Sequence, residues 1–171
     1  MPTTASQRRM MLSDPAAAVQ HWAAEAQTYG KYGNGVVFCQ SEKDANLYMR
    51  IIETGSLIPP FNRTRSFSGA VEYTTLDDHA SLMIRPISGS KDVPSIMGRR
   101  WPFMVFHNPA LWSDRSPIRL LLPHLVPEIC GRTTLISVGT NMTSDAPTAP
   151  ETKAARKEID YAAITRAMSG N

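Results

Sequence analysis

An apolar segment between two helix-start signals most strongly limits how this 171-residue chain can fold. Asp14 followed by Pro15 is typical of a helix N-terminus, and Ser41 with Asp44 resembles a capping box. The segment from Gly35 to Gln40 (Gly-Val-Val-Phe-Cys-Gln) lies between them. Its short apolar run, bounded by turn residues, predicts a buried strand followed directly by a helix.

Further strands are predicted where apolar or β-branched residues cluster. The predicted strands alternate irregularly with the helices, and strict strand–helix–strand alternation is missing. This pattern predicts an α+β fold with a strongly bent, mainly antiparallel sheet of five or six short strands and two or three flanking helices. Val36–Phe38 and Leu135–Val138 should be core strands. The other strands are expected at 70–75, 82–87, 101–107 and 118–122.

The domain organisation follows from where polar segments lie. We expect a mobile N-terminal arm at 1–12, a single domain at 13–140, a linker at 141–151 and a C-terminal helix at 152–171. The arm lacks the apolar stretch of a secretory signal peptide, and no segment approaches the ~18 apolar residues of a membrane span.

The two cysteines indicate the compartment. Cys39 and Cys130 lie in apolar surroundings, which predicts buried thiols that are not bonded to each other. Unbonded thiols indicate a reducing compartment, so we expect a cytoplasmic protein. Delivery of the protein into a host cell is a further option.

Several strong catalytic motifs are absent from the sequence. It contains no Gly-x-x-x-x-Gly-Lys-Ser/Thr, His-Glu-x-x-His, Cys-x-x-Cys or Gly-x-Ser-x-Gly. A P-loop enzyme, a zincin and an α/β-hydrolase are therefore not supported. The four histidines are scattered, so we predict no metal site.

The segment 61–69, expected as a loop, is the most informative for function. Arg63 and Arg65 alternate there with phenylalanines, among them Phe67. Guanidinium groups suit phosphates and aromatic rings stack on flat bases, so the segment predicts an anionic ligand or nucleotide, such as a dinucleotide or RNA. Gly69 should adopt a backbone conformation that is disfavoured for other residues.

Candidate acid–base residues lie on or at the ends of predicted strands. Glu72 interrupts an otherwise apolar strand next to Tyr73, and could act as an acid, a base or a hydroxyl-orienting group. His107 and His124 occur at strand ends, where a nuclease could place proton-transfer groups.

The order of features from Val36 to Thr75 resembles the N-terminal half of ADP-ribosyltransferase-like toxin or effector domains. The strand 36–41 precedes the helix 43–53, then a Gly-containing turn, an Arg-rich loop and the strand 69–75. The resemblance covers about 40 of the 171 residues. It implies a nucleotide-binding transferase that uses NAD to modify a macromolecule.

The resemblance also implies roles for individual residues. Glu72 or Glu128 would stabilise the cationic ribosyl centre. Tyr73, the third predicted catalytic residue, or Phe67 would pack on the nicotinamide. Arg63 and Arg65 should border a concave pocket that also receives Tyr73 or Glu72 and part of the strand 36–41. The residues implied to bind NAD are Gln40, Ser41, Arg63, Arg65 and Phe67.

Two other interpretations stay open. One is a small ribonuclease toxin, in which arginines stabilise the phosphorane and His107 or His124 moves protons. The other is a non-enzymatic binding or assembly module, viral or phage. In that module the Arg-rich segment would bind an acidic partner such as RNA or a host protein, and the C-terminal helix would mediate self-association.

Overall fold

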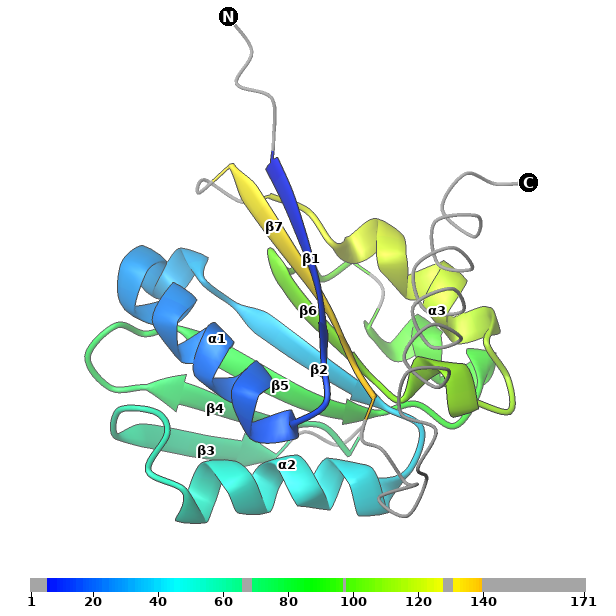
Figure 1. Cartoon of the computed structure of the whole chain (residues 1–171), viewed down its shortest axis with the longest axis horizontal. Helices are drawn as coiled ribbons and strands as arrows, with labels where there is room; N and C mark the ends of the chain where they lie inside the picture. Colours follow the sequence, from blue (N-terminus) through cyan, green and yellow to red (C-terminus); the bar gives the residue numbers. More distant parts are fainter. Residues whose placement is uncertain (1–5, 66–68, 97, 128–130, 140–171) are drawn as a thin grey trace, which may run out of the picture.

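The computed structural model describes residues 6–65, 69–96, 98–127 and 131–139, and within them seven strands form a single sheet (Figure 1). The strand order is β1-β7-β6-β2-β5-β4-β3. Strands β1, β7, β6, β2 and β5 are parallel, β4 is antiparallel to β5, and β3 is antiparallel to β4. The strands are β1 (Ser6–Leu12), β2 (Gly35–Cys39), β3 (Phe61–Arg65), β4 (Val71–Thr75), β5 (Ser81–Pro86), β6 (Phe103–His107) and β7 (Arg132–Val138).

The helices begin where the sequence provides caps. Asp14 accepts a hydrogen bond from the Ala16 amide at the start of the first helix, and Ser41 accepts one from the Asp44 amide at the start of the second. Both caps confirm the sequence prediction. The helices of the described residues are α1 (Pro15–Tyr29), α2 (Glu42–Thr54) and α3 (Ser116–Leu121), with short 3-10 turns η1 (Gly30–Tyr32), η2 (Ser90–Ile96), η3 (Pro109–Leu111) and η4 (Leu122–His124).

Helices cover both faces of the sheet, because its central strands are apolar on both sides. Val37 and Cys39 of β2 pack in one cluster with residues of α1 and α2. Val36 and Phe38 pack in a second cluster with residues of η2 and α3 on the opposite face. In Figure 1, α1 and α2 accordingly lie on one side of the sheet and α3 lies on the other.

The predicted fold class is wrong: the sheet is mostly parallel, and the architecture is α/β instead of α+β. The sequence pattern did not reveal the strand–helix–strand connections that make the sheet parallel. Ser6–Leu12, expected as part of a mobile arm, forms the edge strand β1, whose first four residues are exposed and polar or charged. The segment 118–122, expected as a strand, lies in α3 and η4, where Pro117 occupies the first helical turn.

Further predictions concern single strands, the backbone at Gly69 and the C-terminal segments. Val36–Phe38 and Leu135–Val138 are buried, as predicted. Gly69 has φ +83°, a conformation that L side chains rarely adopt, as predicted. Phe61–Arg65 forms the edge strand β3 instead of a loop. The linker at 141–151 and the C-terminal helix at 152–171 lie outside the described residues, so the division of the chain into domains stays a prediction.

The structure describes one of the two cysteines and allows a search for membrane-spanning helices. Cys39 is a buried free thiol, and its burial raises its pKa well above the ordinary value. Cys130 lies outside the described residues. Within the described part of the chain, no helix is long and apolar enough to cross a membrane.

Gly35 should tolerate no side chain. A Cβ atom there would lie 2.6 Å from Trp22 Cδ1 and 3.0 Å from Phe103 Cδ1, both in the core. Trp22 cannot move freely, because its indole nitrogen donates to the Gly33 carbonyl oxygen at 2.9 Å. We expect Gly35→Ala to lower the free energy of unfolding by about 1–3 kcal/mol, measured by urea denaturation.

The matched control is Gly89→Ala. A Cβ atom at Gly89 would meet only Asp114 Oδ2, at 3.8 Å, which is ordinary contact. This control should change stability little, and an equal loss in both variants would contradict the packing argument.

Candidate ligand site at the carboxyl edge of the sheet

The five parallel strands end at one edge of the sheet, where open α/β sheets bind their ligands. Polar residues follow four of these strands within two positions. They are Ser13 and Asp14 after β1, Gln40 and Ser41 after β2, Ser88 beyond β5 and Asn108 after β6.

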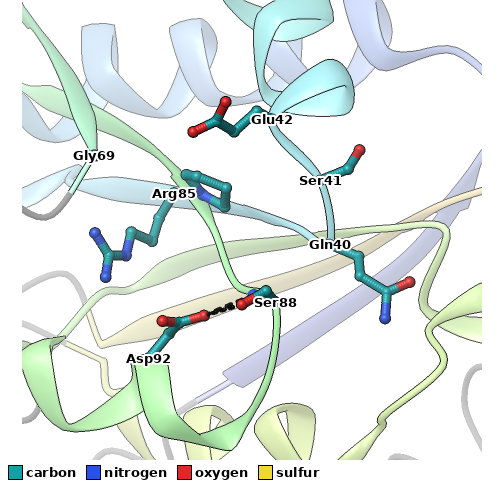
Figure 2. Close-up of a pocket in the computed structure, with 8 residues that line it drawn as sticks. Gln40, Ser41, Glu42, Gly69, Arg85, Ser88 and Asp92 are labelled. Atoms are coloured by element: carbon teal, nitrogen blue, oxygen red, sulfur yellow. Dashed lines mark hydrogen bonds between the residues drawn. The ribbon is translucent and has the colours of Figure 1, made fainter.

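A hollow of about 380 Å³ lies at this edge, between the start of α2 and the turn after β5 (Figure 2). Its volume is within the range of small-molecule sites. The side chains that give it its chemistry are Ser41, Glu42, Arg85, Ser88 and Asp92.

Arg85 and Asp92 place fixed opposite charges in this hollow. Arg85 is only 4% exposed, and burial lowers its pKa while the nearby Asp92 carboxylate opposes that effect. Asp92 Oδ2 accepts hydrogen bonds from the Ser88 hydroxyl at 2.7 Å, the Ser88 amide at 2.8 Å and the Gly89 amide at 3.3 Å. These bonds hold the pKa of Asp92 below its usual range, so the carboxylate is ionised near neutral pH.

A second hollow, also about 380 Å³, continues the first along α2. The two share Glu42, Gly69 and Pro86, and the second adds Arg65 and Asn46. We call the two together the edge groove. Its lining thus runs from the turn after β5 to the end of β3.

A polar network, buried at Tyr48 and His107, lies beside the edge groove and joins α2 to the end of β6. The Ser41 hydroxyl donates to Asp44 Oδ2 at 3.0 Å, and Asp44 Oδ1 lies 3.6 Å from His107 Nε2. The Tyr48 hydroxyl hydrogen-bonds with His107 Nδ1 at 3.0 Å, and Asn108 Nδ2 lies 3.3 Å from His107 Nε2. His107 is 1% exposed, and burial lowers its pKa, while the Asp44 carboxylate opposes this shift. The network thus holds a neutral histidine in place.

The two arginines that the sequence grouped together both lie near Tyr73 but have different surroundings. Arg63 forms an ion pair with Glu53, with Nη1 and Oε1 3.0 Å apart, and Tyr73 donates to the same oxygen at 3.2 Å. Burial and the Glu53 carboxylate raise the pKa of Tyr73. Arg65 lines the edge groove instead. Neither Arg63 nor Tyr73 lines the two hollows described above, so a pocket that both arginines border with Tyr73 stays a prediction.

The remaining predicted residues have other partners or lie outside the described chain. Glu72 forms an ion pair with Arg99, with Oε1 and Nη2 3.4 Å apart. Gln40 lines the first hollow, and its amide nitrogen donates to the Ser113 hydroxyl at 2.8 Å. The His124 ring bonds with the Arg99 carbonyl oxygen. Phe67 and Glu128 lie outside the described residues.

Sequence reasoning missed Glu42, Arg85 and Asp92. A signal for Arg85 was present, since a charged residue directly follows the apolar run Leu-Met-Ile. Asp92 four residues after Ser88 carried no comparable signal, because only folding shows that they are bonded. Among the residues that the structure describes, no three His, Cys, Asp or Glu side chains gather as a metal site.

Comparison with solved structures identifies what the fold resembles. The large terminase of a thermophilic bacteriophage matches with a TM-score of 0.52 and 9% identity, over 79% of this chain and 34% of that one. A crystal form of the same terminase in complex with ADP gives 0.52 and 10%, over 80% and 35%. The ATPase domain of the Thermus phage P74-26 large terminase matches more weakly, with a TM-score of 0.43 and 14% identity over 80% and 61%.

The chain therefore shares its fold with part of a phage large terminase and spans about a third of that protein's length. No protein-family model and no curated protein sequence matches it. The resemblance to ADP-ribosyltransferase-like toxin or effector domains is wrong, because the structural neighbours are phage terminases. The inferred NAD-dependent modification of a macromolecule is wrong for the same reason, and NAD as a ligand is unsupported. That resemblance depended on one strand–helix–strand order, which many α/β folds share.

The Tyr48 hydroxyl should contribute measurably to stability. Tyr48→Phe removes the partner of a buried ring nitrogen, so we expect the free energy of unfolding to fall by about 1–3 kcal/mol in urea denaturation. Tyr32→Phe is the control, since Tyr32 is 36% exposed. If both variants unfolded at the same urea concentration, the Tyr48–His107 bond would carry no net stabilisation.

His107 should make the protein less stable in mild acid. Its folded-state pKa lies below the unfolded value of about 6.5, so the unfolded chain takes up a proton first. Stability is therefore unaffected above about pH 6.5 and falls as the pH drops from there towards the folded-state pKa. His107→Gln should flatten this part of the profile, measured by urea denaturation at several pH values. Identical slopes in the two proteins would assign the acid sensitivity to other groups.

Proposed function

We propose that this chain is a packaging- or assembly-related binding domain with a P-loop NTPase-like fold that does not hydrolyse nucleotides. The fold likeness to phage large terminases supports the packaging or assembly context. The turn between β1 and α1 carries the proposal. It consists of Ser13 and Asp14 alone, which is too short for the Gly-rich phosphate-binding loop that a P-loop enzyme places between a strand and a helix.

A P-loop needs the sequence Gly-x-x-x-x-Gly-Lys-Ser/Thr between a strand and a helix, so that backbone amides surround the phosphates. Here Asp14 occupies the start of α1 and accepts the Ala16 amide at 2.9 Å. A carboxylate thus takes the place that a phosphate would bind. The start of α2 is equally unsuited, since Ser41, Glu42 and Asp44 surround it.

The described parallel strands also lack the metal-binding aspartate that such an enzyme carries at a strand end. P-loop NTPases hold Mg²⁺ with the Ser/Thr of the loop and an aspartate at a strand end. The last residues of the five parallel strands are Leu12, Cys39, Pro86, His107 and Val138. None of these side chains supplies the hard, anionic oxygen that Mg²⁺ prefers.

Nucleotide binding without hydrolysis is the second candidate. It is motivated by the thermophilic phage terminase, which has been solved in complex with ADP. Two helix N-termini that carry their own carboxylates speak against tight phosphate binding, because like charges repel.

The purified chain should release no phosphate from Mg-ATP above the buffer blank in a colorimetric assay, with an active P-loop ATPase as the positive control. Mg-ADP should leave the thermal melting midpoint unchanged, because the phosphates find no site. Hydrolysis that disappears in Asp14→Ala or His107→Gln would overturn the proposal. A stabilising shift with ADP alone would favour the second candidate.

A further inference from the structure

We propose that the edge groove binds an extended peptide segment of a partner protein that carries both acidic and basic side chains. This inference rests on the proposed function, because a packaging or assembly module requires a surface for its partner. The groove offers a continuous lining for such a segment, since its two hollows share Glu42, Gly69 and Pro86.

The charges of the groove select the class of partner. Arg85 and Asp92 line the first hollow, Arg65 lines the second, and Glu42 borders both. Positive and negative side chains are thus balanced along it. Surfaces that bind nucleic-acid phosphates are basic overall, so the two carboxylates disfavour a phosphodiester chain. Arg85 is 4% exposed and Asp92 is bonded to Ser88, so both charges are engaged within the protein. Glu42 and Arg65 are exposed, and a peptide with side chains of both signs can pair with these two groups.

The rest of the lining suits a peptide backbone. Asn46 is exposed on α2 and has an amide that can both donate and accept hydrogen bonds. Ala45, Met49 and Val71 are mostly buried and supply apolar contact beneath it. Gly69 lines both hollows and has no side chain, so a chain can approach its backbone closely.

A phage-displayed library of random short peptides, selected on the folded chain, tests this proposal. Enriched sequences should contain both acidic and basic residues. The best peptide, labelled and titrated by fluorescence polarisation, should bind Glu42→Lys and Arg65→Glu about tenfold more weakly or worse, since each reversal replaces a charge pair with repulsion. Thermal melts of both variants establish that they are folded.

Lys43→Glu is the matched control. Lys43 is exposed in the same helical turn as Glu42 but does not line the groove, so its reversal should leave peptide affinity nearly unchanged. An equal loss in Lys43→Glu would indicate non-specific electrostatics and overturn the proposal. The proposal would also be overturned if no peptide were enriched. The same would follow if a single-stranded DNA oligonucleotide bound the groove and displaced the labelled peptide. These outcomes would contradict peptide binding at the groove but not the proposed function. ATP hydrolysis by the chain would contradict the proposed function, whether or not peptides bind.

Discussion

The burial of β2 on both faces is the constraint on which the other layers depend. Its residues alternate between the two apolar clusters, with Val37 and Cys39 facing α1 and α2, and Val36 and Phe38 facing η2 and α3. A strand of this kind must be covered on both sides, because leaving either face in water would forfeit about 1.5–3 kcal/mol for each large side chain. Parallel pairing with β5 and β6 then follows, since helical crossovers provide that cover.

Parallel pairing has a chemical consequence, because it brings the carboxyl ends of five strands to one edge. Residues distant in sequence meet there, such as Asp44 at the start of α2 and His107 at the end of β6. The network of Ser41, Asp44, Tyr48 and His107 links α2 to β6 at this edge through polar contacts, of which the Tyr48–His107 bond is buried. A rigid edge of this kind is a suitable support for a binding surface.

The fold and the site lead to different conclusions about activity. The sheet resembles that of a phage large terminase, but fold alone does not determine chemistry. Nucleotide hydrolysis by a P-loop enzyme depends on a phosphate-binding loop and a metal-binding aspartate. In this chain the turns from β1 to α1 and from β2 to α2 are both short and lack the Gly-Lys-Ser/Thr sequence of such a loop. The edge groove, with balanced charge, lies elsewhere along the same edge and suits recognition.

The sequence by itself determined the elements whose signals are local. Asp14 and Ser41 specify where α1 and α2 begin, because a cap acts within one helical turn, and the apolar run of β2 indicates its burial. Only the tertiary structure decided which strands pair and which charges meet. Ser6–Leu12 is a strand because β7 supplies its hydrogen-bond partners, and Arg85 joins Glu42 in one groove because β5 lies beside β2. Such pairings join distant segments, and no local periodicity records them.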